Sequence, residues 1–141
     1  MKLAINLDGL PVPVTQALVE QLSVQIDKQA IKLEQINSLV FNYRDKSYSA
    51  DLGGYHPVEI RLQHNAGGWT FDYITSFSFV GMIYPELTKD ADFDFSQGRG
   101  SLIYQGDFPL DQLASFYRLW ESNFLSYIEM DCFDEITVSC D

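Results

Sequence analysis

The sequence has few cysteines and no long apolar run. Its 141 residues include two cysteines, Cys132 and Cys140. Two thiols at this spacing make neither a disulfide framework nor a zinc site, so we expect reduced thiols. No apolar stretch approaches the roughly 20 residues that cross a bilayer, and the first residues lack the apolar core of a signal peptide. We therefore expect a cytoplasmic protein that makes no membrane contact.

Basic residues are also scarce. Nine Lys and Arg stand against 20 Asp and Glu, for a formal net charge of −11. Because nucleic-acid binders and proteins that dock on anionic lipid need basic surfaces, direct nucleic-acid binding is not expected. Residues 1–85 hold eight acids and six bases, net −2, whereas residues 86–141 hold twelve acids and three bases, net −9. The acidic C-terminal part either attracts a basic partner, imitates a nucleic-acid backbone or only maintains solubility, and the sequence leaves these alternatives open.

Motifs that bind cofactors or metal ions are missing as well. The glycine turns at 67–68 and 98–100 lack the strand-to-helix setting and the spacing of a phosphate-binding loop. Asp90–Asp94 has carboxylates at alternate positions, as at the start of a calcium-binding loop. However, residues 95 and 101 are Phe and Ser, where such a loop needs Gly and Glu. On a strand the three Asp side chains would share the solvent face, so we expect no cofactor and no metal site.

Aromatic and other apolar residues are abundant. Hydrophobic residues make up 46% of the chain and aromatic residues 14%, which excludes a disordered or low-complexity protein. A chain of 141 residues has the length of one domain and can bury a core without disulfides or a metal. We expect residues 1–141 to form a single globular domain.

A β-hairpin is predicted at the centre of the chain. Residues 58–63 alternate apolar and polar side chains with the period of a half-buried strand. After a glycine turn, Trp69, Phe71 and Tyr73 start the second strand and are expected to face the core. Weaker patterns predict strands over residues 36–44, 74–80, 91–95, 101–105 and 136–140, with a turn or short edge segment at 85–87.

Two amphipathic helices flank the strands. Leu18, Leu22 and Ile26 form one apolar stripe of a helix of about four turns that begins near Thr15. A longer aromatic stripe follows residues 107–109 and runs to residue 127, which suits a core helix or the seam of a homo-oligomer. The sequence therefore predicts an α+β fold: a twisted antiparallel sheet of about five to seven strands, with an N-terminal helix and a long C-terminal helix that covers one sheet face.

Polar and aromatic residues around a glycine pair form a candidate binding site, because loop residues of these types often carry recognition. The candidates are Arg44, Asp45, Tyr48, Tyr55, His56 and Glu59. Arg44 and Asp45 would equally serve to brace the turn. His56 and Glu59 fall on opposite faces of a regular strand, which disfavours an acid–base pair. A structural histidine bonded to the backbone is the favoured interpretation of His56.

Five segments together resemble an uncharacterised bacterial family, domain of unknown function 2787. They are residues 41–49, 53–60, 73–77, 92–95 and 120–124, of which Gly53–Ile60 (GGYHPVEI) is the most specific. A member of that family is similar in fold to the mitochondrial acidic matrix protein family, which binds complement component and many other proteins. The resemblance implies a twisted antiparallel sheet between N- and C-terminal helices, and it brings no assigned activity. The strand predicted after the last helix departs from that pattern.

The leading hypothesis is a non-enzymatic acidic module that binds an unidentified, basic protein partner. It rests on the net charge and on the lack of a convergent catalytic set. One alternative is a small-molecule-binding protein or hydrolytic enzyme that uses Arg44, Tyr55 and His56. Another is a nucleic-acid mimic that binds a basic protein.

Overall fold

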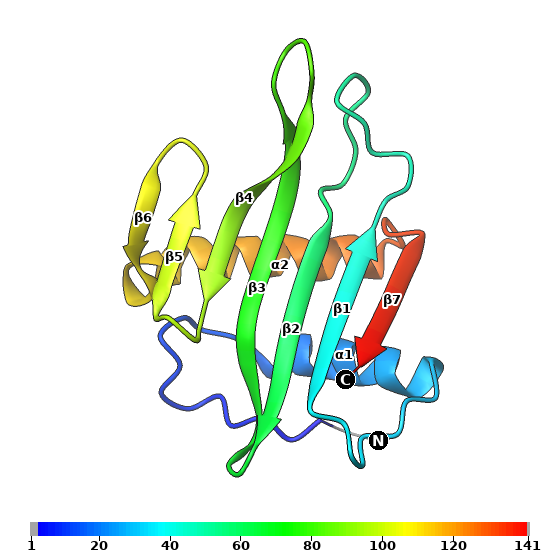
Figure 1. Cartoon of the computed structure of the whole chain (residues 1–141), viewed down its shortest axis with the longest axis vertical. Helices are drawn as coiled ribbons and strands as arrows, with labels where there is room; N and C mark the ends of the chain where they lie inside the picture. The colour runs from blue at the N-terminus through cyan, green and yellow to red at the C-terminus, as the bar shows by residue number, and fades with distance from the viewer. Residues whose placement is uncertain (1–2, 141) are drawn as a thin grey trace.

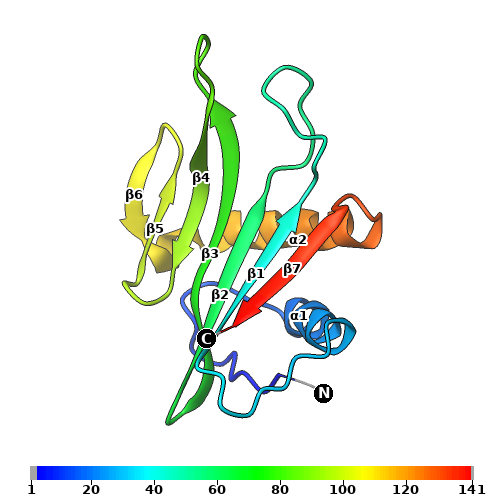
Figure 2. The same cartoon turned by 45° about the vertical axis from the view of Figure 1, so that its right-hand side comes forward.

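The computed structural model describes residues 3–140, which form a seven-stranded sheet with two helices on one of its faces (Figures 1 and 2). Every neighbouring pair of strands is antiparallel, in the order β6-β5-β4-β3-β2-β1-β7. The elements are α1 (Gln16–Lys28), β1 (Ser38–Arg44), β2 (Val58–Asn65), β3 (Gly68–Val80), β4 (Glu86–Asp94), β5 (Arg99–Leu102), β6 (Gly106–Pro109), the 3-10 helix η1 (Leu110–Leu113), α2 (Ala114–Glu129) and β7 (Glu135–Cys140). The predicted α+β class and arrangement are confirmed.

The central hairpin of β2 and β3 carries the sheet side of the core. Val58, Ile60 and Leu62 are buried beneath the helices, as their alternation predicts. On the neighbouring strand, Leu39 and Phe41 are fully buried. Because alternate residues of a strand point to opposite faces, the other residues of these strands lie on the helix-free side, here called the open face.

A bulge between β2 and β3 changes which side chains of β3 reach the core. Leu62 pairs with Phe71 while Arg61 pairs with Tyr73, so Asp72 is the extra residue. Ile74 is then buried instead of Tyr73. The predicted inward position of Tyr73 is therefore wrong, because one inserted residue reverses the alternation beyond it.

A second bulge lies between β3 and β4. Ser76 pairs with Ala91 and Phe77 with Lys89, which leaves Asp90 as the extra residue. Asp90 turns toward the helix side of the sheet, whereas Asp92 pairs with Thr75 on the open face. The expectation that all the Asp side chains of residues 90–94 share the solvent face is therefore wrong for Asp90.

The far edge of the sheet differs from its predicted course. The segment at 85–87, expected to be a turn or short edge segment, runs from Pro85 in the loop into β4, which begins at Glu86 and lies between β3 and β5. The strand expected at 101–105 ends at Leu102, and a turn through Tyr104, whose φ is 64°, leads to the unpredicted strand β6. Gly106 allows this tight reversal because its φ is 98°.

The two helices follow their predicted stripes. Thr15 caps the N-terminus of α1 by accepting a hydrogen bond from the Leu18 backbone N–H at 3.4 Å. In Figure 1, α2 crosses behind the strands at mid-height and α1 lies below it. Within residues 3–140, no helix combines the length and the apolar character needed to cross a bilayer.

A buried glutamate joins the two helices. Glu121 of α2 is 2% exposed, and it accepts hydrogen bonds from the Thr15 backbone N–H at 3.2 Å, from the Thr15 hydroxyl, and from the Tyr117 hydroxyl at 2.6 Å. Because Thr15 caps α1, the carboxylate lies at the positive end of that helix dipole. Burial and then the charge of Glu121 raise the pKa of Tyr117 above its ordinary value. No pattern in the sequence indicated Thr15 as the partner of Glu121, since the two residues are 106 positions apart.

A glutamine protects one edge of the sheet. The side-chain amide of Gln29, just after α1, donates to the Ile136 carbonyl at 3.2 Å and accepts from the Val138 backbone N–H at 3.1 Å. It thus occupies the position of a neighbouring strand on β7. Covering an edge in this way prevents pairing with strands of other molecules.

Replacing Glu121 with Ala should lower the free energy of unfolding by about 3 kcal/mol, because three donors, including the buried Tyr117 hydroxyl, lose a charged acceptor. Urea denaturation followed by far-UV circular dichroism measures this loss. Glu129→Ala, on an exposed site of the same helix, is the matched control and should change stability by less than about 0.5 kcal/mol. Equal effects of the two substitutions would contradict the role of Glu121.

Replacing Tyr43 with Phe should stabilise the protein by about 1 kcal/mol. The Tyr43 ring meets Phe124 and Phe133 edge-on, with ring centroids 5.0 and 5.8 Å away, whereas its buried hydroxyl has no hydrogen-bond partner among residues 3–140. Tyr117→Phe should instead destabilise the protein, because that hydroxyl donates to Glu121. The same denaturation measures this change. A loss of stability in Tyr43→Phe would contradict the prediction, because it would show that the Tyr43 hydroxyl makes a hydrogen bond.

Candidate binding site at the loop end of the sheet

The loops β1–β2, β3–β4 and β5–β6 lie at the same end of the sheet (Figure 1). We call residues 45–57, 81–90 and 103–107 the loop end. It contains most of the residues that the sequence marked as candidates.

Asp45 organises the β1–β2 loop. Its carboxylate accepts hydrogen bonds from the backbone N–H groups of Ser47 at 3.0 Å and Tyr55 at 3.1 Å. The hydrogen bonds from Ser47 and then Tyr55 lower the pKa of Asp45. Gly54 passes so close that a Cβ there would lie 2.8 Å from the Asp45 carboxylate and 2.9 Å from the Tyr48 Cα. Asp45 therefore braces the loop, which was one of its two predicted roles.

His56 is held between an aromatic ring and a carboxylate. The Tyr48 ring lies 5.1 Å from the rings of both His56 and Phe79, and the Tyr48 hydroxyl accepts from the Phe79 backbone N–H at 2.9 Å. The His56 Nδ1 is 2.7 Å from the Asp90 carboxylate. Ser76 donates its hydroxyl to the other oxygen of Asp90. The predicted backbone partner of His56 is therefore wrong, since its partner is the bulge residue Asp90.

The order of these three groups determines their chemistry. Burial raises the pKa of Asp90, but the hydrogen bonds from His56 and Ser76 outweigh it, so the pKa lies below its ordinary value. In a serine nucleophile relay the histidine stands between hydroxyl and carboxylate. Here the Asp90 carboxylate stands between Ser76 and His56, so His56 does not take the proton of Ser76. With Nδ1 donating to Asp90, a neutral imidazole keeps Nε2 as a free acceptor.

A pocket of about 480 Å³ lies between the loop end and α2. Its polar groups include the His56–Asp90 pair, Asn123 and Gln105. Aromatic rings form a large part of its lining, and they are Tyr55, Phe116, Trp120, Phe124, Tyr127 and Phe133. This size and lining are typical of a ligand site.

The structure brings together Asp45, Tyr48, Tyr55 and His56, four of the six candidates. Glu59 instead lies on the open face, where it accepts a hydrogen bond from the Tyr73 hydroxyl. Arg44 is exposed at the end of β1, in register with Glu135 of β7.

Residues of α2 and the bulge were missed as site residues. The aromatic stripe of α2 predicts packing, and it does pack, but Trp120, Phe124 and Tyr127 also line the pocket. Asp90 and Ser76 come to the site through a β-bulge, for which the sequence carries only an irregular alternation.

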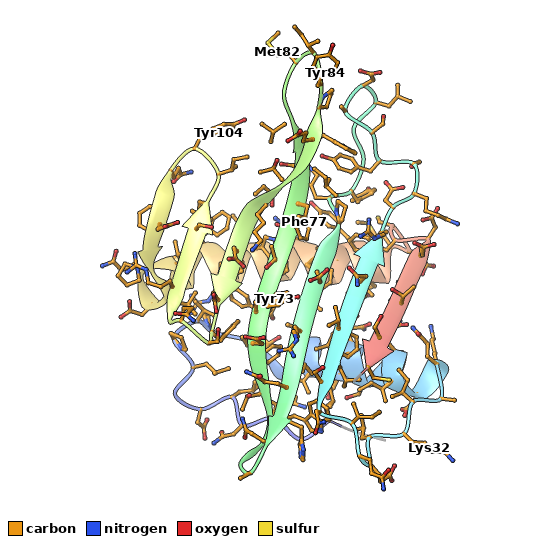
Figure 3. All side chains as sticks on the ribbon, viewed as in Figure 1. Lys32, Tyr73, Phe77, Met82, Tyr84 and Tyr104 are labelled. Carbon is orange, nitrogen blue, oxygen red and sulfur yellow. The ribbon has the colours of Figure 1, made fainter. Side chains whose placement is uncertain are left out.

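Large apolar side chains stand exposed at the loop end. Their exposed fractions are 89% for Leu52, 99% for Met82, 81% for Ile83, 85% for Tyr84 and 86% for Tyr104. Figure 3 shows Met82, Tyr84 and Tyr104 projecting from the tips of the loops, away from the sheet. Apolar side chains gathered in this way mark interaction surfaces in soluble proteins.

The open face is polar, and many of its polar side chains bond to one another. Arg61 pairs with Asp72 at 2.5 Å, and Thr75 donates to Asp92 at 2.6 Å. Tyr73 and Phe77 lie on this face (Figure 3), and burial followed by the hydrogen bond to Glu59 raises the pKa of Tyr73. Among residues 3–140, no group of three or more His, Cys, Asp or Glu side chains is placed to hold a metal ion.

A second hollow of about 540 Å³ lies between α1 and α2. Val24, Leu125 and Ile128 line it, with Glu20 and Glu129 among its polar groups. It contains none of the candidate residues.

Comparison with known proteins agrees with this architecture. Residues 16–139 match the model of a family described as a protein of unknown function, DUF2787. The chain belongs to this family. No curated protein is significantly similar to it.

Two solved structures are similar over nearly the whole chain. A hypothetical protein from the VSP-II pathogenicity island of Vibrio cholerae is 41% identical, with a TM-score of 0.84, over 95% of this chain and 99% of that one. A conserved hypothetical protein from pathogenicity island VPI-2 of Vibrio cholerae O1 biovar eltor is 34% identical, with a TM-score of 0.81, over 94% and 98%. The latter is described as sharing structural homology with the human P32 protein. P32 represents the mitochondrial acidic matrix protein family, so both the family resemblance and the fold similarity expected from the sequence are confirmed.

Replacing Asp90 with Asn should change how stability depends on pH. A carboxyl whose pKa is lower in the folded state stabilises the fold above its unfolded pKa of about 3.9 and loses that contribution as pH falls through the folded pKa. We expect wild type to be more stable than the variant by about 1 kcal/mol at pH 7. The difference should shrink below about pH 4.

Urea denaturation from pH 7 to pH 3 measures this difference. Asp51→Asn, in the exposed part of the same loop, is the control and should follow wild type throughout. A difference between wild type and Asp90→Asn that stays constant down to pH 3 would contradict the assignment of the hydrogen bonds to the ionised carboxylate.

Proposed function

We propose that this protein is a non-enzymatic interaction module that binds a basic protein partner through the loop end. The observation that carries the proposal is the cluster of exposed apolar side chains on three neighbouring loops. Met82, Ile83 and Tyr84 follow one another at the tip of the β3–β4 hairpin and are at least 81% exposed. Each exposes apolar surface to water, which binding to a partner would remove.

The charge of the loop end indicates the chemistry of the partner. Residues 45–57, 81–90 and 103–107 include five acidic residues and two lysines, for a net charge of −3 with neutral histidine. The acids are Asp45, Asp51, Glu86, Asp90 and Asp107, and the lysines are Lys46 and Lys89. A surface that combines exposed apolar side chains with a net negative charge complements a partner surface that combines apolar side chains with Lys and Arg. The same charge disfavours anionic lipid as the target.

The open face supports binding less well than the loop end. Its charged side chains are already engaged in pairs such as Arg61 with Asp72, and a partner would have to replace those interactions. The order Ser76–Asp90–His56 does not activate a nucleophile, so the geometry favours binding over hydrolysis.

Affinity capture with loop variants tests the proposal. The bait is the full chain with Met82, Ile83 and Tyr84 all replaced by Ser. Because these residues lie on an exposed loop outside the core, the variant should fold with an unchanged unfolding midpoint. We expect a partner that wild type captures at low salt to be reduced at least about tenfold in the variant, and to be released at high salt.

The matched control replaces Leu119 and Met130, two exposed apolar residues near α2, with Ser. This control should capture the partner as wild type does. Equal capture by wild type and the loop variant would contradict the proposal. Sedimentation of wild type, but not the loop variant, with neutral phosphatidylcholine vesicles would assign the apolar loops to a lipid surface instead. Release of the partner by added DNA would favour the nucleic-acid mimic.

A further inference from the structure

We propose that the pocket between the loop end and α2 binds a compact organic cation, an alkylammonium or guanidinium group. Two sources have this chemistry: a free small amine, or a Lys or Arg side chain of the basic partner. Only the second source rests on the proposed function.

Aromatic rings surround the pocket from several directions. The Tyr55 and Tyr127 rings lie 4.9 Å apart at an interplanar angle of 61°, and the Tyr55 and Phe133 rings lie 6.4 Å apart at 65°. The Trp120 and Phe124 rings stack at 5.2 Å on the helix side of the pocket. All five residues line the pocket, and aromatic π-systems attract a cation that lies over their faces, Trp most strongly.

The charges at the pocket favour a cation over an anion. Of the side chains that line it, Asp90 is acidic, and neither Lys nor Arg is among them. An anionic ligand would therefore find no Lys or Arg side chain, and it would approach a protein with a formal net charge of −11. A cation would find the Asp90 carboxylate, whose lowered pKa keeps it ionised at neutral pH.

The Asp90 carboxylate can accept further hydrogen bonds from a ligand. One carboxylate oxygen accepts from His56 and the other from Ser76, and each carboxylate oxygen has two lone pairs. These two hydrogen bonds also fix the carboxylate in orientation. The pocket volume of about 480 Å³ lies within the range for small ligands.

The probes are choline, butylguanidinium, the uncharged choline isostere 3,3-dimethyl-1-butanol, and the anion 3,3-dimethylbutanoate. Titrations into the full chain at pH 8 are followed through the two tryptophan indole N–H signals in nitrogen-15 NMR spectra. Trp120 lines the pocket, while Trp69 lies in β3 outside it and serves as the internal control. We expect both cations to shift the Trp120 signal only, and to bind at least about tenfold more tightly than the neutral isostere. The anion should not bind.

Two variants separate charge from shape. Asp90→Asn keeps the size of the side chain and should reduce cation binding about tenfold, with little effect on the neutral isostere. Asp92→Asn, on the open face, should bind as wild type does. Equal binding of cation and neutral isostere, tighter binding of the anion, or no effect of Asp90→Asn would overturn the proposal.

The source of the cation is settled by capture of the partner. If a partner side chain fills the pocket, excess choline and the Asp90→Asn substitution both reduce capture. If the ligand is a free amine, neither affects capture, although the probes still bind. The Ser variant at Met82, Ile83 and Tyr84 should bind choline as wild type does, so a failure of the loop-end proposal and a failure of the cation proposal give different results.

Discussion

The buried carboxylate of Glu121 determines how α2 lies across the sheet. It bonds the cap of α1 through Thr15 and the preceding turn of α2 through Tyr117, so it ties this face of α2 to the N-terminus of α1. The adjacent Trp120 then faces the sheet and lines the pocket, as do Phe124 and Tyr127, one and two turns further along α2. A buried acceptor is costly unless its donors are matched, and here three donors match it. The aromatic wall of the candidate site therefore depends on this interaction.

Irregularities in the sheet complete that site. The strands extend past α2 toward the loop end (Figure 2), so the upper part of the sheet is not fully covered by the helix and a pocket remains. The bulge at Asp90 turns a carboxylate from the open face into this pocket, where His56 from the β1–β2 loop meets it. A regular β4 would have left the pocket without a charge. Bulges next to binding sites commonly redirect a side chain in this way.

The fold could be predicted from the sequence better than the site. The periodicity of apolar residues shows which side chains are buried, but it does not show which residues far apart in the chain contact each other. The stripe of Leu18, Leu22 and Ile26 and the alternation of residues 58–63 locate the helix and the hairpin correctly. The loop cluster of Asp45, Tyr48, Tyr55 and His56 was recognised because glycine and proline mark the loop. The partner of His56 could not be found, because Asp90 lies 34 positions away and reaches it only through a bulge. Glu121 falls on the buried stripe of α2, four residues after Tyr117 and three before Phe124, but its partner Thr15 lies 106 positions away and could not be found.

Our proposal that partners contact the loop end and not the open face can be tested by site-specific photo-crosslinking in living cells. A photoreactive benzoylphenylalanine would replace Tyr84 at the tip of β3–β4 in one protein, and Thr137 on the exposed surface of β7 in another. Contact at the loop end would give a discrete cross-linked partner from position 84 and none from position 137. The same partner cross-linked from position 137 and absent from position 84 would contradict it.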